Sequence, residues 1–444
     1  MATVTDVTTA HTTGLTHIDA LVDDGPAWNY VTPATNNTLT YAFAISSGNE
    51  NQSYALTAFN GAQQAATRSL LAYVSSVTGI RFQETLDGNA AQWHFSMHNL
   101  PDPQTSGLCS WNTSYNYDGA GQITKYQANA WVYLDNVEWA SSNGDLSAGG
   151  SGYETLLHEV GHALGLKHPF EGSVQLPTNL DTTANTVMSY TESGGPYSTY
   201  RPFDLATLYW LYGGDGLGGK LGVGSVNDGR YLMGSSAGER LATGTGNDIL
   251  IGLAGNDTLD GGAGIDTAVF AGSRSLYTVS RSGDSLIVRD NTGAMGADTL
   301  SNIERLRFDD RYLNFDTDGT SGQVYRLYQA AFDRVPDAGG LGFWFHVIED
   351  TGASLSQAAA GFMSSAEFKA MYGTSPSAET VISLFYNHVL HRQAEQSGFN
   401  YWVDVIHQGN PVADVLAAFA ESAENQAQVI GTIQNGMEFI PYTG

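Results

Sequence analysis

Three histidines and a glutamate lie close together in the segment LLHEVGHALGLKHP, residues 156–169. His158 and His162 are four residues apart, so on a helix both imidazoles project from one face and can bind a single cation. Gly165 can adopt a positive φ and end that helix, which lets the chain turn and present His168 as a third nitrogen ligand. Three neutral imidazoles leave one coordination position open, as a catalytic zinc site requires.

Glu159 lies beside the first of these histidines, close enough to reach a water molecule at the ion without binding the ion itself. Zinc lowers the pKa of such a water and polarises a carbonyl, while Glu159 accepts the proton and passes it to the leaving amine. The segment therefore predicts peptide-bond hydrolysis at one catalytic zinc ion. The alternatives are a chance pair of histidines on a helix and a structural zinc site, but a structural site has no use for Glu159.

The spacing HExxHxxGxxH resembles the metzincin metalloproteases, in which a methionine turn follows the zinc motif. Twenty residues beyond His168 the sequence reads TVMSY, with Met188 at the turn position and Tyr190 two residues later. Pro169, directly after the third histidine, and the triplet M-S-Y are similar to the serralysin branch. The resemblance implies a structural role for Met188. It also implies that Tyr190 binds zinc in the free enzyme and hydrogen-bonds the transition-state oxyanion during catalysis.

Other segments of the first 215 residues also resemble serralysins, namely THIDALVDDGPAWN, SSVTGIRFQE and DLATLYWLYG. The resemblance implies that residues 130–134 form the strand at the edge of the cleft, which pairs with an extended substrate through main-chain hydrogen bonds. Ala130, Trp131 and Val132 are then the expected substrate-binding residues. A plain internal strand is the alternative for this segment.

A nine-residue repeat follows, in which TGTGNDILI (243–251), GLAGNDTLD (252–260) and GGAGIDTAV (261–269) align. The preceding GSSAGERLA keeps the phase, with Glu239 at the acidic position, whereas Leu253 replaces a glycine. The repeat is similar to the nonapeptide of RTX proteins, a parallel β-roll. Glycines allow its tight turns, and aspartates supply the hard oxygen ligands that Ca²⁺ prefers. A flexible linker rich in glycine and aspartate is the alternative. The predicted residues for several structural calcium ions are Asp248, Asp257, Asp266, Gly244, Gly246, Gly255, Gly262, Gly264, Asn247 and Asn256.

From about residue 322 the apolar spacing becomes helical, and a second duplication appears. Tyr328, Arg334 and Trp344 are each matched 58 residues later, by Tyr386, Arg392 and Trp402. This duplication predicts two similar helical units packed together. The region resembles a domain of unknown function that is often appended to RTX proteins. Two roles are possible for this domain: attachment to a cell surface or substrate, and assistance in export.

The sequence thus predicts a multidomain protein. The expected parts are a flexible leader or short propeptide (1–14), an α/β metzincin, zincin-like catalytic domain (15–215), an RTX parallel β-roll with capping strands (216–318), and a C-terminal all-α domain (319–444).

The chain is strongly acidic, with 18 Lys and Arg against 45 Asp and Glu among 444 residues. Such a charge repels nucleic acid and anionic lipid surfaces, so neither is an expected partner. A single cysteine excludes an intramolecular disulfide framework. We expect no membrane span and no N-terminal signal peptide, because the start of the sequence has neither a basic segment nor an apolar run. The resemblance to RTX proteins implies a type I export system as a partner and an extracellular or cell-surface location.

These observations together predict a secreted, zinc-dependent endopeptidase stabilised by calcium, with protein or peptide substrates. A cell-surface component is one candidate partner of the helical domain. One alternative is a processing protease of narrow specificity for surface proteins. The other is a non-enzymatic, calcium-dependent surface-binding protein.

Overall fold

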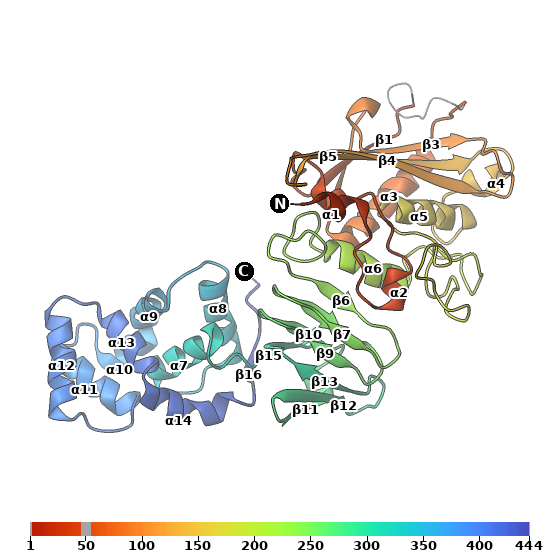
Figure 1. The fold of residues 1–444 in the computed structure, drawn as a ribbon. Coiled ribbons are helices and arrows are strands. Elements are labelled where there is room, and N and C mark those ends of the chain that lie inside the picture. Colours follow the sequence, from red (N-terminus) through yellow and green to blue (C-terminus); the bar gives the residue numbers. More distant parts are fainter. Residues whose placement is uncertain (1, 46–54, 444) are drawn as a thin grey trace. The chain divides into compact units, whose positions relative to one another are not determined.

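The computed structural model describes residues 2–45 and 55–443 and divides into two compact units, of which the first ends at Asp266 and the second begins at Thr267 (Figure 1). Mixed α/β structure occupies most of the first unit, and helices dominate the second. The expectation of a multidomain protein is therefore confirmed. No helix in the described part of the chain combines the length and the apolar character that crossing a membrane requires.

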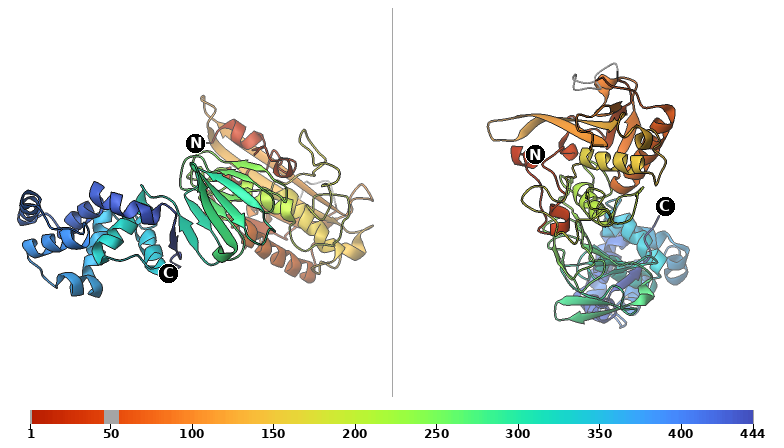
Figure 2. Two further views of the ribbon diagram at one scale, coloured as in Figure 1. Left: turned by 90° about the horizontal axis from the view of Figure 1, so that it is seen from below. Right: turned by 90° about the vertical axis from the view of Figure 1, so that its right-hand side faces the viewer.

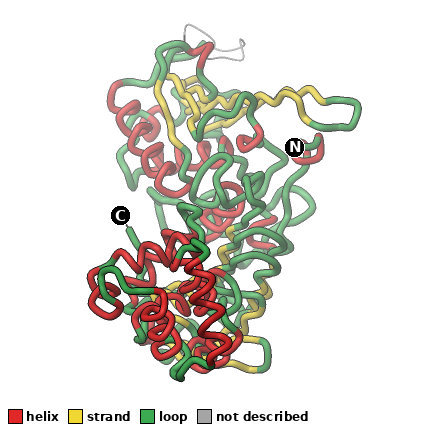
Figure 3. The backbone as a smooth tube through the Cα atoms, turned by 90° about the vertical axis from the view of Figure 1, so that its left-hand side faces the viewer, coloured by secondary structure: helices red, strands yellow, loops and turns green. Residues whose placement is uncertain are grey.

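One five-stranded sheet forms the centre of the first unit, in the order β2-β1-β3-β5-β4. Its strands are β1 (Thr38–Ala42), β2 (Arg81–Glu84), β3 (Trp93–His98), β4 (Gly107–Tyr117) and β5 (Ile123–Asp135). Four of them run parallel, and β4 is antiparallel to β5. Pairing of β5 with β3 begins at Ala130, so the first half of β5 forms with β4 a ribbon that extends beyond the sheet (Figure 3).

This strand order corrects the prediction that Ala130, Trp131 and Val132 lie at the edge of the cleft. All three pair with β3 on one side and with β4 on the other, so their strand is internal. Ala130 and Val132 are completely buried. An apolar strand in the middle of a sheet and one at its edge have similar sequences, which is why the pattern misplaced this segment. In the described part of the chain β4 is the strand at this edge of the sheet.

The longest helices of this unit in the described part of the chain contribute to its core, namely α3 (Gly61–Thr78), α5 (Ser151–Ala163) and α6 (Pro202–Tyr212). Figures 1 and 2 show α3 and α5 on one face of the sheet. Asn60 and Gln63 form a capping box at the start of α3. The core includes Leu70 of α3 and Leu156 of α5, both fully buried, and each such side chain contributes about 1.5–3 kcal/mol. Shorter elements are α1 (Val4–Thr8), α2 (Thr16–Asp19), α4 (Ala140–Asn143), η1 (Trp28–Tyr30) and η2 (Gly88–Ala90).

The first residues differ from the expected flexible leader. Thr3 and Asp6 form a capping box at the start of α1. The Val4 amide donates to the Gly121 carbonyl at 3.1 Å, and the Trp210 indole N–H donates to the His11 carbonyl at 2.6 Å. These long-range hydrogen bonds, which no local pattern predicts, hold the segment on the α/β unit.

The nonapeptides fold into short parallel strands at the end of the first unit. These are β6 (Tyr231–Met233), β7 (Arg240–Ala242), β8 (Ile249–Ile251) and β9 (Thr258–Asp260). Strand β6 pairs with β8 and β7 pairs with β9, so each strand lies beside the one two repeats later. The central leucines of all four strands are buried between the turns. This arrangement agrees with the expected parallel roll.

Strands of the second unit form two groups. In the first group β10 (Thr267–Val269) pairs in parallel with β14 (Arg305–Arg307), followed by antiparallel β15 (Tyr312–Asn314) and β16 (Met437–Phe439). In the second, β11 (Tyr277–Ser282), β12 (Ser285–Asp290) and β13 (Ala297–Ser301) are antiparallel neighbours, preceded by η3 (Arg274–Leu276). Strand β16 lies near the end of the chain, so it joins the helical region back to these strands (Figure 1).

The helices of the second unit repeat one pattern. Arg334 lies over the Tyr328 ring at 5.1 Å, and Arg392 lies over the Tyr386 ring at 5.0 Å. Each arginine also forms an ion pair with a glutamate of a later helix. The duplicated residues are therefore structural. The helices are α7 (Thr320–Phe332), α8 (Ala338–Glu349), α9 (Leu355–Ser364), α10 (Ala366–Tyr372), α11 (Ala378–His388), α12 (Gln396–His407), α13 (Val412–Ala420) and α14 (Ala423–Ile433).

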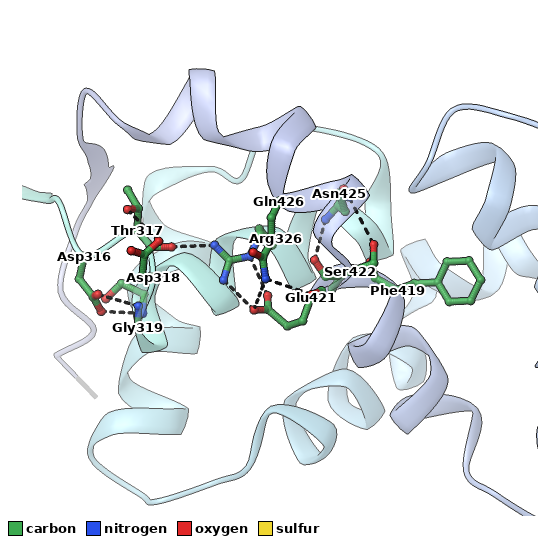
Figure 4. A network of polar contacts seen from close by, with 12 residues as sticks. Asp316, Thr317, Asp318, Gly319, Arg326, Phe419, Glu421, Ser422, Asn425 and Gln426 are labelled. Carbon is green, nitrogen blue, oxygen red and sulfur yellow. Dashed lines mark hydrogen bonds and ion pairs between the residues drawn. The ribbon is translucent and has the colours of Figure 1, made fainter.

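A buried arginine joins the beginning and the end of this helical region (Figure 4). Arg326 of α7 is 4% exposed and donates two hydrogen bonds of 2.7 Å to the Glu421 carboxylate. A third hydrogen bond, also 2.7 Å, goes to the Thr317 carbonyl. The guanidinium thus has charged and polar partners in place of water, which a buried charge requires.

Leu253 has a strained backbone conformation. Its φ is +67°, at a position that is occupied by Gly244 and Gly262 in the neighbouring repeats. A left-handed conformation costs a side chain roughly 1–2 kcal/mol, whereas the added flexibility of glycine costs about 0.5–1 kcal/mol. Leu253→Gly should therefore raise the free energy of unfolding by up to about 1 kcal/mol in urea denaturation with calcium present.

Leu86→Gly is the control for this substitution, since Leu86 is 90% exposed and is not among the residues with positive φ. It should lower the unfolding free energy. An equal loss in both variants would contradict the assignment of strain to Leu253.

Candidate metal centre

Three imidazole nitrogens converge at the end of α5. His158 and His162 lie one helical turn apart, and the chain turns at Gly165, with φ +93°, to bring His168 opposite them. The His168 Nε2 atom lies 3.2 Å from His158 Nε2 and 3.1 Å from His162 Nε2. In the described part of the chain this is the one group of three or more His, Cys, Asp or Glu side chains whose ligand atoms all lie within 4.8 Å of one another.

The other ring nitrogens determine which tautomers are present. His158 Nδ1 lies 2.8 Å from the Val187 carbonyl, and His162 Nδ1 lies 2.8 Å from the Leu166 carbonyl. A carbonyl only accepts, so each Nδ1 carries the proton and each Nε2 presents a lone pair. Burial lowers the pKa of His158 to about 3 and that of His162 to about 4. Both rings are therefore neutral at pH 7, as metal ligands must be.

This donor set fits zinc. A tetrahedral zinc ion with Zn–N distances of about 2.0–2.1 Å separates two ligand nitrogens by roughly 3.3 Å. The two Nε2 separations of 3.1 and 3.2 Å are close to that value. A cation bound between the three nitrogens would stabilise lone pairs that lie this close together.

Glu159 is buried beside the histidines on α5. Its side chain is 5% exposed, and burial raises its pKa to about 8, so the carboxylate form is favoured only near a positive charge. The main chain of Cys109 hydrogen-bonds the carboxyl group. A Cβ atom on Gly107 would lie 2.8 Å from Glu159 Oε1, so a glycine at the start of β4 leaves the room that this side chain occupies.

Met188 packs beneath the motif helix and is fully buried. A Cβ atom on Gly161 would lie 2.7 Å from Met188 Sδ, so the helix carries a glycine where the methionine approaches it. Sequence analysis missed Gly161 and Gly107. A signal for Gly161 existed, because glycine inside a helix costs about 1 kcal/mol relative to alanine and implies a packing reason.

Asp204, at the start of α6, holds the methionine turn and was also missed. Its carboxylate accepts hydrogen bonds from the Thr186 hydroxyl at 2.5 Å and from the Val187 amide at 2.9 Å. The Val187 carbonyl in turn orients His158. Through these contacts α6 supports His158, which lies 46 residues earlier in the chain.

Tyr190 lies at the open side of the centre. Its hydroxyl is 2.9 Å from His168 Nε2, and its residue is 68% exposed. The hydroxyl is thus within reach of an ion held by the histidines, while the exposed ring has room to move away.

The nonapeptide turns bring their aspartates together. Asp248, Asp257 and Asp266 are all buried. The Asp248 amide donates to Asp266 Oδ1 at 2.8 Å, which joins turns two repeats apart. Asp248 Oδ1 accepts from the Arg230 amide at 2.6 Å, and the Thr243 side chain also hydrogen-bonds this carboxylate. Burial raises the pKa of Asp248, so a nearby cation would stabilise its charged form.

Other predicted calcium-site residues shape the same turns. Asn247 Oδ1 accepts from the Ile265 amide at 2.9 Å, and Asn256 occupies the equivalent position of the next turn. Gly244 does not have a positive φ. The left-handed conformation occurs at Gly246, Gly255, Gly262 and Gly264.

Comparison with known proteins finds two matching family models and distant relatives over part of the chain. Residues 233–268 match the family described as the RTX calcium-binding nonapeptide repeat, and residues 307–372 and 359–429 match a domain of unknown function, DUF4214. The chain is 29% identical over 170 residues to Serralysin G of Dickeya chrysanthemi, covering 35% of this chain and 34% of that protein. It is 32% identical over 143 residues to Serralysin of Photorhabdus luminescens, covering 30% and 27%. Metalloprotease AprA of Pseudomonas entomophila is 24% identical over 216 residues, covering 44% and 42%.

The chain thus matches less than half the length of these relatives. Among solved structures, extracellular lipase LipA of Serratia marcescens is similar over 19% of this chain and 17% of that chain, with 21% identity and a TM-score of 0.12. That likeness carries no argument. The comparisons establish calcium-binding repeats and distant serralysin homologues over part of the chain.

Gly161→Ala tests the contact between the motif helix and Met188. The new methyl group would overlap Met188 Sδ, so we expect the free energy of unfolding to fall by about 1–3 kcal/mol despite the better helix propensity of alanine. Urea denaturation measures this change. Gly61→Ala, at a helical position where a Cβ meets nothing within 4 Å, is the matched control and should be neutral or stabilising. Equal stability of the Gly161 variant and the wild type would contradict the packing.

Proposed function

We propose that this chain is a secreted zinc endopeptidase of the serralysin type, with a metzincin catalytic domain (15–215), a calcium-stabilised roll (216–318) and a helical accessory domain (319–444). The observation that carries the proposal is the convergence of three imidazole nitrogens beside a buried glutamate. A structural zinc site does not require such a carboxylate. The distant serralysin homologues support the same activity.

Each residue of the site has a separate task in the proposed reaction. His158, His162 and His168 hold zinc, which supplies a Lewis acid that activates water and polarises the substrate carbonyl. Glu159 accepts a proton at its carboxylate and delivers it to the leaving amine. Tyr190 either contacts the ion or, after its exposed ring moves, donates its hydroxyl proton in a hydrogen bond to the oxyanion.

An extended substrate binds along β4 in this proposal. Strand β4 has β5 on one side, and its N-terminal end, Gly107, contacts Glu159. A peptide added to the other side by main-chain hydrogen bonds would pass directly in front of the zinc centre. This position replaces Ala130, Trp131 and Val132 as the substrate-binding segment.

Calcium and secretion belong together in the proposal. Buried aspartates in stacked turns repel one another without cations, so the roll should be unstable at low cytosolic calcium and fold in millimolar extracellular calcium. Such behaviour suits a type I export system, which passes unfolded chains. The helical domain is proposed to contact a cell-surface component.

Glu159→Gln is the sharpest test of the catalytic assignment. The amide keeps the shape of the side chain but cannot accept the proton, so casein cleavage should fall by about 10²–10⁴-fold. Zinc content, measured by atomic absorption after dialysis, should stay at one ion per chain because Glu159 is not a ligand. Glu138→Gln, on the exposed loop after β5, should cleave casein normally. Cleavage by the Glu159 variant at the wild-type rate would refute the proposal.

Asp248→Asn tests the calcium site. For the wild type, calcium at 100 times its dissociation constant should add about 2.7 kcal/mol of stability, seen as a higher melting temperature than with chelator. The neutral amide should lose most of that increment, whereas the exposed Asp102→Asn should keep it. An unchanged calcium increment in the Asp248 variant would argue against this residue as a ligand.

A further inference from the structure

The third histidine is held differently from the other two. His158 and His162 lie on α5, and each donates its Nδ1 proton to a main-chain carbonyl. His168 lies beyond the end of the helix, in a loop, and its Nδ1 is 3.0 Å from Oε1 of Glu171. A side-chain carboxylate therefore takes the place that a carbonyl has at the other two rings.

The main chain around Glu171 is anchored. Lys167 Nζ donates to the Ala20 carbonyl at 2.6 Å, to the Glu171 carbonyl at 2.9 Å and to the Val174 carbonyl at 3.3 Å. Gly172, with φ +75°, turns the chain directly after the glutamate. Half of the Glu171 side chain is exposed, but its backbone is held at both ends of this short loop.

An aromatic ring covers one face of the same histidine. Phe170 stacks on His168 with ring centroids 5.1 Å apart and an interplanar angle of 5°. The stacked Phe170 ring limits how far the imidazole plane can tilt. The Glu171 carboxylate limits how far the imidazole can turn within its own plane. Two neighbouring residues thus fix both angles that aim Nε2 at the other histidines.

We propose that Glu171 is a positioning residue for His168, which holds the Nδ1–H tautomer and directs Nε2 to the metal. This inference rests on the proposed function. A carboxylate behind a ligating histidine orients the ring and increases its basicity, and its loss costs typically 10–100-fold in metal affinity. A carboxylate partner should matter more for His168 than for the other two histidines, because His168 lies outside the helix that restrains them.

The experiment compares full-length Glu171→Ala, Glu171→Gln and Glu192→Ala with the wild type. Glu192 is an exposed loop carboxylate close in sequence to Tyr190, so its alanine variant has the same change in charge without loss of a histidine partner. Zinc affinity is measured by competition with a chromophoric chelator. Visible absorption of the cobalt-loaded protein reports the coordination geometry.

We expect Glu171→Ala to bind zinc about 10–100-fold more weakly than the wild type and to show altered cobalt bands. Glu171→Gln should lose less affinity, because its amide oxygen still accepts the Nδ1 proton, and Glu192→Ala should match the wild type. Melting temperatures of the metal-free proteins should agree, since the effect concerns the metal and not the fold.

Wild-type affinity and cobalt spectrum in Glu171→Ala, or an equal loss in Glu192→Ala, would overturn the positioning role while leaving the proposed function intact. A wild-type chain that binds zinc but cleaves no peptide would instead overturn the proposed function, and the affinity series would still test the role of Glu171. A wild type that binds no zinc would overturn both.

Discussion

The whole candidate site depends on holding three imidazole lone pairs about 3 Å apart, an arrangement that isolated side chains do not maintain. Each ring is held from behind by a hydrogen bond at Nδ1, and the three acceptors come from different parts of the chain: Val187, Leu166 and Glu171. The conformational entropy of each ring is therefore already lost on folding, before an ion binds. Metal binding then gains affinity because little conformational entropy remains to be lost.

The same requirement explains the packing around the motif helix. Two glycines stand where β-carbons would collide, Gly161 against Met188 and Gly107 against Glu159. Asp204 holds the methionine turn from the side of α6, so the position of His158 depends on a helix far away in sequence. Substitutions at these supporting positions should therefore shift the histidines and Glu159 without changing the side chains of the centre themselves.

A related constraint governs the roll. Buried carboxylates such as Asp248 lose hydration, and bound cations would compensate for that loss. In the proposed function zinc and calcium would act on the chain in the same physical way, since each would stabilise groups that folding has brought together and removed from water. The helical region uses another solution, in which arginines such as Arg326 meet buried or half-buried carboxylates directly.

Local spacing was sufficient to predict the cluster of three histidines, the turn at Gly165 and the phased aspartates, because helix and turn periodicity places such residues without reference to the rest of the fold. The order of the strands, the contacts of the first residues, and the support from Gly107 and Asp204 depend on contacts between distant segments. Ala130, Trp131 and Val132 were misplaced for that reason, since an apolar strand has the same pattern inside a sheet as at its edge. The neighbours of a strand such as β5, and the groups that restrain a ring such as that of His158, are determined only by the packing of the whole chain.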